Sequence, residues 1–134
     1  MQAPGRWTLL LALIAVGCIP VPRGPNPLDL RFMTPEQLGE YSEQVFRHQN
    51  AVLTRMMFAG FEIDLLDEEP AEKIRAAERA VNETCDDLNR LASMRMNDDQ
   101  ASLLLMSEAW FEVRSCQQRT DELEQLLNRH GIPG

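Results

Sequence analysis

The sequence predicts an all-α protein: a three-helix antiparallel bundle on a Pro-rich N-terminal tether, with one disulfide between helices. After residue 34, apolar residues recur at intervals of three, four and seven, as on one face of a helix. Capping sequences stand before two of these segments. No segment alternates convincingly with a period of two, so we expect no β-strands. The 134 residues, 44% of them apolar and 25% charged, suit one globular domain with appendages.

Residues 1–17 are typical of a secretory signal peptide. Arg6 and the amino terminus give a weakly positive start, and Trp7 to Gly17 is then eleven residues without a charge. A helix that crosses a bilayer needs about 20 residues, so this stretch is too short to span one. A buried core helix is the alternative, but the stretch has no polar face.

The end of this segment carries a family resemblance. Ala15-Val16-Gly17-Cys18 resembles the lipobox of bacterial lipoproteins, in which the Cys thiol receives a diacylglycerol. The commonest lipobox has Leu where Ala15 stands and Ala or Ser where Val16 stands. Simple secretion remains the alternative, because small-x-small also fits an ordinary cleavage site.

The resemblance implies where the mature protein lies. It implies acylation of Cys18 and a lipid anchor on the periplasmic face of the outer membrane, because no Asp follows the Cys. Two or more acyl chains hold a protein stably. The alternative location is the soluble periplasm or the exterior.

Residues 18–33 form the predicted tether. They contain four prolines at close spacing, which favour an extended polyproline conformation: Pro20, Pro22, Pro25 and Pro27. At about 3.1 Å per residue, such a segment would hold a domain roughly 40–50 Å from the membrane. A leader without a spacing role is the alternative.

The first helix is predicted over residues 35–59. Thr34-Pro35-Glu36-Gln37 is a capping box with Pro at the first helical position, and Gly60 is the predicted stop. Its apolar face comprises Leu38, Tyr41, Val45, Val52, Leu53 and Met56.

A bend and a second helix follow. We expect the apolar side chains of the bend to fold back onto the bundle: Phe61, Ile63, Leu65 and Leu66. The second helix begins at Pro70 and runs to about Met94, with a buried face of Ile74, Ala77, Val81, Leu88 and Leu91.

The third helix completes a domain of residues 34–134. Asn97-Asp98-Asp99-Gln100 is its predicted cap, and Gly131 its end. Its predicted apolar face comprises Leu103, Met106, Trp110, Val113, Thr120, Leu123 and Leu127.

Acylation of Cys18 leaves an even pair, Cys85 and Cys116, in an oxidising compartment. We predict that they form a disulfide, with two separate buried thiols as the alternative. In a hairpin centred near residue 97 this pair lies about 10 Å out of register at 1.5 Å per residue. Because a disulfide needs Cα atoms within about 7 Å, the hairpin must be staggered, or its loop must extend toward Ala101.

Several function classes have little support. A net charge of −8 argues against a nucleic-acid partner, which a basic surface would bind. The two histidines, His48 and His130, stand alone, and the sequence has no phosphate loop, nucleophile elbow or His-x-x-x-His spacing. We therefore predict no enzyme activity, no cofactor and no metal site.

The leading hypothesis is a lipid-anchored periplasmic interaction or adaptor module that binds an envelope protein through an apolar groove between helices. The candidate partner-binding residues are Phe58, Phe61, Trp110 and Phe111. Trp110 and Phe111 are adjacent on a helix and cannot both face the same core. The alternative for Phe111 is that a neighbouring segment covers it.

A second resemblance concerns the helical domain. Met33-Thr34-Pro35-Glu36-Gln37 is similar to the Leu-Thr-x-x-Gln motif of small helical periplasmic stress chaperones and metal sensors, and Met96-Asn97-Asp98-Asp99-Gln100 echoes it. The resemblance implies a chaperone or metal sensor as the alternative function. Those proteins tend to be basic and to lack Cys, unlike this chain. Helical lipoproteins that pilot secretion-channel subunits are similar in size, anchor and helix content only.

Overall fold

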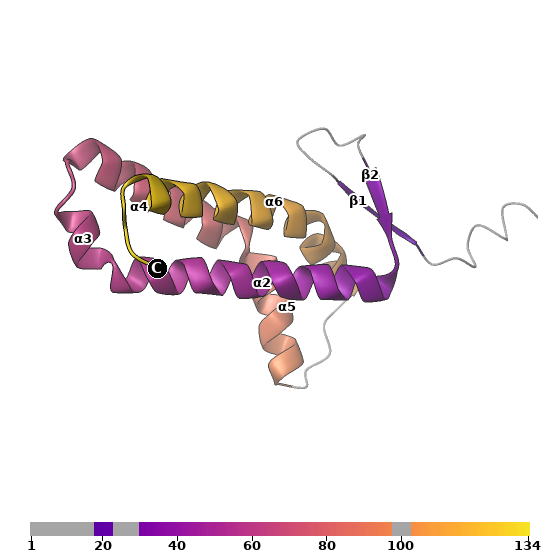
Figure 1. The fold of residues 1–134 in the computed structure, drawn as a ribbon. Helices are drawn as coiled ribbons and strands as arrows, with labels where there is room; N and C mark the ends of the chain where they lie inside the picture. The colour runs from indigo at the N-terminus through magenta and orange to yellow at the C-terminus, as the bar shows by residue number, and fades with distance from the viewer. Residues whose placement is uncertain (1–17, 23–29, 98–102) are drawn as a thin grey trace, which may run out of the picture.

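The computed structural model describes residues 18–22, 30–97 and 103–134, which are mainly helical as predicted (Figure 1). The predicted signal peptide, residues 23–29 of the tether and the predicted cap residues 98–100 lie outside the described residues. The elements are β1 (Ile19–Pro22), β2 (Leu30–Met33), α2 (Pro35–Phe58), α3 (Gly60–Asp64), α4 (Glu68–Thr84), α5 (Asp86–Met96) and α6 (Leu103–Arg129). Among the described helices, none is both long and apolar enough to span a membrane.

The start of α2 has the predicted capping box. The Gln37 backbone N–H donates to Thr34 Oγ1 at 3.2 Å, and the Thr34 N–H donates to Gln37 Oε1 at 3.0 Å. Pro35 occupies the first turn, where a helix has no use for its missing N–H. α2 ends at Phe58, one residue before the predicted end at residue 59. Gly60, which was predicted to terminate the helix, is instead the first residue of α3.

The end of α6 is fixed by its own backbone and by α2. The Ile132 N–H donates to the Leu127 carbonyl at 3.0 Å and the Gly131 N–H to the Asn128 carbonyl at 3.2 Å. Gly131 has a φ of 67°, the left-handed conformation that this ending requires. Arg55 of α2 donates from Nε to the Pro133 carbonyl at 3.0 Å and from Nη1 to Asn128 Oδ1 at 2.8 Å, so the C-terminus is held against α2.

α6 is the central helix and packs against α2, α4 and α5 (Figure 1). α2 runs in the same direction as α6: Tyr41 hydrogen-bonds Gln117 at 2.5 Å, and Arg55 bonds Asn128 fourteen residues further along α2. α4 runs in the opposite direction and packs against α6. The buried core joins these helices and includes Leu38, Val45, Val52, Ile74, Val81, Leu88, Val113, Leu123 and Leu127.

The predicted second helix is two helices. α4 ends at Thr84 and α5 begins at Asp86, and α5 turns away from the line of α4 in Figure 1. Cys85 stands at this break and forms a disulfide with Cys116 of α6, with the Cα atoms 4.9 Å apart. The apolar face continues through the break, since Ile74, Val81, Leu88 and Leu91 are all buried.

The expectation that the chain has no strands is wrong. β1 and β2 pair antiparallel, with Ile19 opposite Met33 and Pro22 opposite Leu30. Pro20 and Pro22 are two residues apart, so their missing donors lie on one edge of β1 and leave the other edge to pair. The pairing returns residue 33 to residue 19, so segment 18–33 does not extend as a spacer, and β1 contacts α6 while β2 contacts α2.

The expected fold-back of the bend is half right. Ile63 is buried and Leu66 is half-buried, but Phe61 and Leu65 are 73% and 70% exposed. Phe61 and Leu65 each lie two residues from Ile63, about 200° around a helix. They therefore point away from the core when Ile63 points into it.

Candidate functional site

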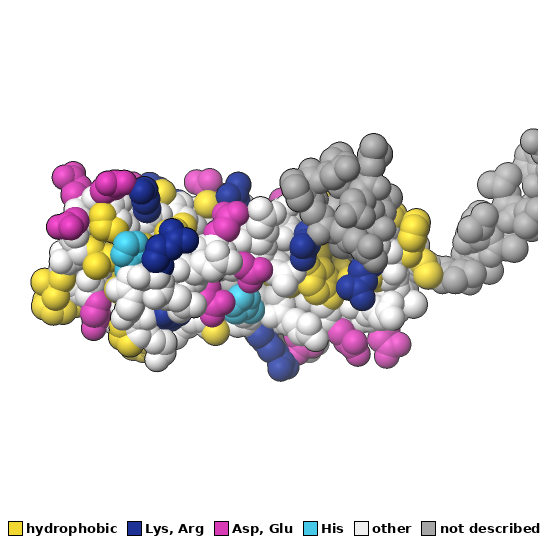
Figure 2. All heavy atoms as spheres, turned by 45° about the horizontal axis from the view of Figure 1, so that its top comes forward, with side chains coloured by type: hydrophobic (Ala, Val, Ile, Leu, Met, Phe, Trp, Pro, Cys, Tyr) yellow, Lys and Arg dark blue, Asp and Glu magenta, His cyan; other side chains and the backbone are white. Residues whose placement is uncertain are grey.

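Among the described residues, the largest group of exposed apolar side chains surrounds the turn between α2 and α3. We call it the end patch, and it consists of Met57, Phe58, Phe61 and Leu65, which are 71%, 77%, 73% and 70% exposed. Figure 2 shows hydrophobic side chains at the end of the molecule where α3 lies. Soluble proteins seldom expose several large apolar side chains together unless the surface binds something.

The local helix geometry produces the end patch. Met56 and Ala59 are buried on the core face of α2, so Met57 and Phe58 between them project from the other side. Ile63 likewise takes the core position of α3. Phe58 and Phe61 are among the residues predicted to bind a partner, whereas Met57 and Leu65 were not predicted to lie on such a surface. The sequence did contain a signal for Met57: it and Phe58 are adjacent bulky residues next to Met56, and neighbouring residues on a helix cannot all face the core.

Carboxylates flank the end patch. Glu62, Asp67 and Glu68 are exposed there, and Asp64 pairs with Arg75 of α4 at 2.5 Å. The rim of the patch is therefore mainly acidic, which suits a partner whose apolar anchors are bordered by Lys or Arg.

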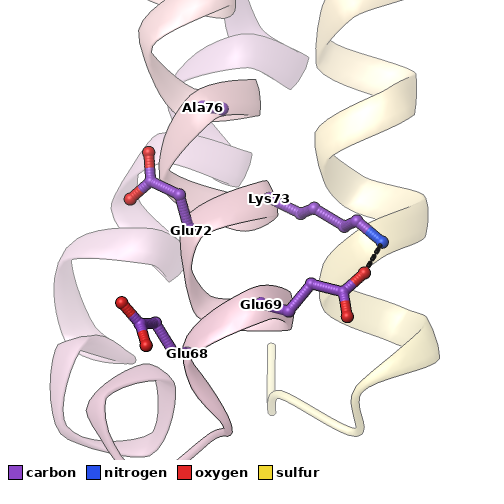
Figure 3. A pocket seen from close by; sticks show the side chains of 5 residues that line it. All are labelled: Glu68, Glu69, Glu72, Lys73 and Ala76. Atoms are coloured by element: carbon purple, nitrogen blue, oxygen red, sulfur yellow. Dashed lines mark hydrogen bonds and ion pairs between the residues drawn. The ribbon is translucent and has the colours of Figure 1, made fainter.

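The acidic surface continues along α4 as a shallow hollow of 550 Å³ lined by Glu68, Glu69, Glu72, Lys73 and Ala76 (Figure 3). Lys73, the only Lys of the chain, lies on the side of α4 that faces α6 and donates to Glu69 at 2.6 Å. This contact lowers the pKa of Glu69, and Arg79 lowers the pKa of Glu72 in the same way. These exposed ion pairs keep the flank charged and solvated.

The other two candidate residues lie elsewhere. Trp110 is partly buried against the core and Phe111 is 65% exposed, as expected for neighbours 100° apart. Residues of α2 and α6 in contact differ by 73 to 76 in number, so Phe111 is level with the start of α2. At 1.5 Å per residue it lies about 30 Å from Phe58 along the helices. The four candidates therefore form two separate surfaces.

An apolar groove lies between α2 and α5. It has a volume of 390 Å³, with Phe46 on one wall and Leu88, Leu91 and Ala92 on the other. Ser42, Glu43 and Arg47 form its polar rim, with Glu43 and Arg47 paired to each other. α5, which turns away from the line of α4 in Figure 1, provides the Leu88, Leu91 and Ala92 wall of this groove.

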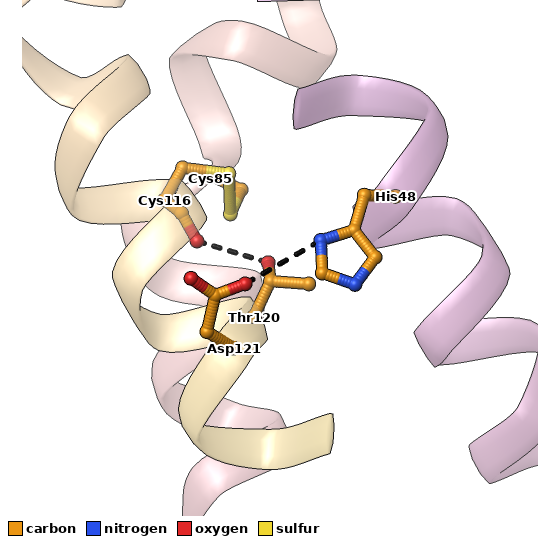
Figure 4. The surroundings of a disulfide bond; sticks show 5 residues. All are labelled: His48, Cys85, Cys116, Thr120 and Asp121. Carbon is orange, nitrogen blue, oxygen red and sulfur yellow. Dashed lines mark hydrogen bonds and ion pairs between the residues drawn. A yellow bond between two sulfur atoms is a disulfide. The ribbon is translucent and has the colours of Figure 1, made fainter. Parts of the chain in front are cut away.

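Cys85 and Cys116 are fully buried, and Figure 4 shows them beside Thr120. Thr120 is also buried and satisfies its hydroxyl by donating to the Cys116 carbonyl one turn earlier, at 2.9 Å. The predicted lipidation residue, Cys18, is exposed and directly precedes β1.

One carboxyl of α6, four residues before Cys116, has a shifted pKa. Partial burial is the main cause that raises the pKa of Glu112 above the usual 4.5, and the Asp87 carboxylate raises it further. Its Oε2 is buried without a hydrogen-bond partner among the described residues. Glu112 thus faces the acidic start of α5.

No family model matches the chain, and neither a curated protein nor a solved structure matches it.

Proposed function

We propose that the protein is a lipid-anchored helical adaptor of the bacterial envelope, without catalytic activity, that binds an envelope protein. Cleavage before Cys18 and acylation of its thiol hold the chain at the periplasmic face of the outer membrane. Residues 18–33 link this anchor to a helical bundle domain of residues 34–134. The exposed thiol at the start of β1 supports an acylation site that the modifying enzymes reach.

The end patch is the observation that carries the proposal. Four large apolar side chains, each at least 70% exposed, lose contact with water when a partner covers them. Phe58 and Phe61 are the anchors, because aromatic side chains bury large areas and dominate interface energies. The acidic rim favours a partner with basic residues around an apolar pocket.

The position of the end patch fits an anchored adaptor. β1 and β2 lie at the beginning of α2, whereas the end patch lies where α2 ends, at the other end of the molecule (Figure 1). An acyl chain on Cys18 places the beginning of α2 nearest the membrane. The end patch then faces the periplasm, where it is open to a partner.

Photocrosslinking in intact cells tests this function. A photoreactive phenylalanine analogue at position 61 should crosslink one discrete partner. The same analogue at position 82, where Asn82 is exposed on α4, is the matched control and should give no such band. Equal crosslinking from both positions would contradict a docking role for the end patch.

The Leu-Thr-x-x-Gln resemblance supports a periplasmic stress chaperone or metal sensor as the alternative function. A chaperone would crosslink many unfolded clients from position 61, and it would suppress their aggregation when purified. The adaptor would yield one partner and would leave the aggregation of unfolded proteins unchanged.

A further inference from the structure

α2 and α6 bring one histidine and two carboxylates together. His48 Nε2 lies 3.1 Å from Glu124 Oε2, and His48 Nδ1 lies 3.6 Å from Asp121 Oδ1. Figure 4 shows the His48 ring from α2 facing Asp121 on α6. One ligand atom from each of the three residues can be chosen so that all lie within 4.8 Å of one another.

The histidine cannot satisfy both carboxylates while neutral. A neutral imidazole carries one N–H, so one ring nitrogen donates to a carboxylate and the other presents a lone pair to the second carboxylate. A lone pair facing a carboxylate oxygen calls for a cation between them. That cation is either a second proton on the ring or a metal ion.

The spacing suits a metal ion. Two ligands each about 2.0–2.2 Å from one ion are separated by about 3 Å, which is close to the distance between Nε2 and Glu124 Oε2. One imidazole binds a given ion through one nitrogen, so Nε2 is the ligand atom of His48. Asp121 faces the other nitrogen, Nδ1, at 3.6 Å, where a carboxylate orients the ring of a metal-bound histidine. Asp121 and Glu124 are three residues apart on α6, so both project from one face of the helix. The side chains are 33–46% exposed, which lets water complete the coordination.

The donor chemistry selects the kind of metal. Imidazole with carboxylates suits Zn²⁺ and its neighbours among the first-row divalent metals, whereas Mg²⁺ and Ca²⁺ prefer oxygen ligands only. Two carboxylates carry a charge of −2, which a divalent ion balances. We propose that His48, through Nε2, and Glu124 bind a divalent transition-metal ion that joins α2 to α6, with Asp121 orienting the imidazole through Nδ1.

Such an ion would complement the disulfide. Asp121 follows Thr120, which hydrogen-bonds Cys116, so the metal would join α2 to α6 about one turn beyond the place where the disulfide joins α4 to α6. The site is independent of the end patch, and its failure would leave the proposed function intact.

Calorimetric titration of the untagged, chelator-treated protein with Zn²⁺ is the test, in a Cys18→Ser background that removes the free thiol. We expect one bound ion per chain. When free Zn²⁺ is about 100-fold above Kd, the melting temperature should rise by roughly 10 °C. His48→Gln should abolish binding, and Asp121→Asn or Glu124→Gln should weaken it by about 10–100-fold.

His130→Gln is the matched control, since it removes the other histidine from the end of α6 and should bind Zn²⁺ like the parent protein. Circular dichroism of each variant verifies its helix content. Absence of saturable binding in the parent, or unchanged binding in both His48→Gln and Glu124→Gln, would overturn the proposal.

Discussion

Cys85 lies at the break between α4 and α5, and its disulfide partner Cys116 lies near the middle of α6 with their Cα atoms 4.9 Å apart. The bond thus joins α6 to the point where the chain changes direction. Both cysteines are fully buried within the core cluster, so the disulfide is also part of the packing.

Removal of the disulfide should destabilise the domain. Closing a loop with a sequence separation of 31 contributes about 3–4 kcal/mol in the chain-entropy model, and we expect Cys85→Ser/Cys116→Ser to lose about 2–4 kcal/mol. The melting temperature should therefore fall by about 10 °C or more, as thermal denaturation followed by circular dichroism would measure. Non-reducing peptide mass spectrometry should show the two cysteines joined in the parent. Two alkylatable thiols in the native, oxidised protein would contradict the bond.

We expect lipidation to depend on one thiol. Radiolabelled palmitate should appear on the protein, and Cys18→Ser should abolish the label and release the domain into the soluble periplasm, because no acyl chain then holds it. The Cys85→Ser/Cys116→Ser variant is the control and should keep its label. Palmitate labelling that survives Cys18→Ser would eliminate the lipoprotein hypothesis.

Glu112 should make stability depend on pH. Its pKa is raised in the folded state, so the folded protein holds the proton more tightly than the unfolded chain does. The stabilisation is fully present below about pH 4.5 and is lost as pH rises through the raised pKa. Glu112→Gln should remove this decline and raise the melting temperature at pH 7 relative to the parent.

Melting temperatures measured between pH 4 and pH 7 check this prediction. Glu83→Gln, which changes an exposed carboxyl on α4, is the control and should retain the decline of the parent protein. A Glu112→Gln variant with the pH dependence of the parent would show that this carboxyl is not its source.

Phe111 should contribute little to stability. It is 65% exposed, so Phe111→Ala should cost under about 0.5 kcal/mol and leave the melting temperature nearly unchanged. Leu123→Ala, on the same helix but fully buried, should cost about 2–5 kcal/mol. Urea denaturation of both variants measures the difference. A large loss for Phe111→Ala would mean that a neighbouring segment covers this side chain in solution.

Local rules predicted much of the helical structure. Thr34 and Gln37 cap α2 as their spacing predicts, and helical periodicity identified buried positions such as Val45, Ile74 and Leu127. Helix caps and buried helix faces depend on residues close together in sequence, so one amino-acid sequence is enough to predict them. The pattern of apolar residues did not identify Gln49 as buried, because its side chain is polar although it occupies a core position of α2.

Features that depend on distant residues were harder to predict. The break at Cys85 has no Gly or Pro to indicate it, and the strands form in a Pro-rich segment. His48 meets Glu124 only because α2 and α6 pack in one register, which periodicity within either helix does not determine. The exposure of Phe61 likewise follows from the inward position of Ile63, which the sequence pattern of so short a helix leaves open.

The end patch is the centre of the functional account, and a quantitative pull-down from intact membranes tests it most directly. Phe58→Ala/Phe61→Ala removes both proposed aromatic anchors, each more than 70% exposed, and leaves Cys18 in place. We predict that this variant recovers at least about tenfold less of the partner, since each interface anchor contributes at least about 2 kcal/mol. Its melting temperature should stay within a few degrees of the parent. Undiminished partner recovery with the double variant would contradict the account.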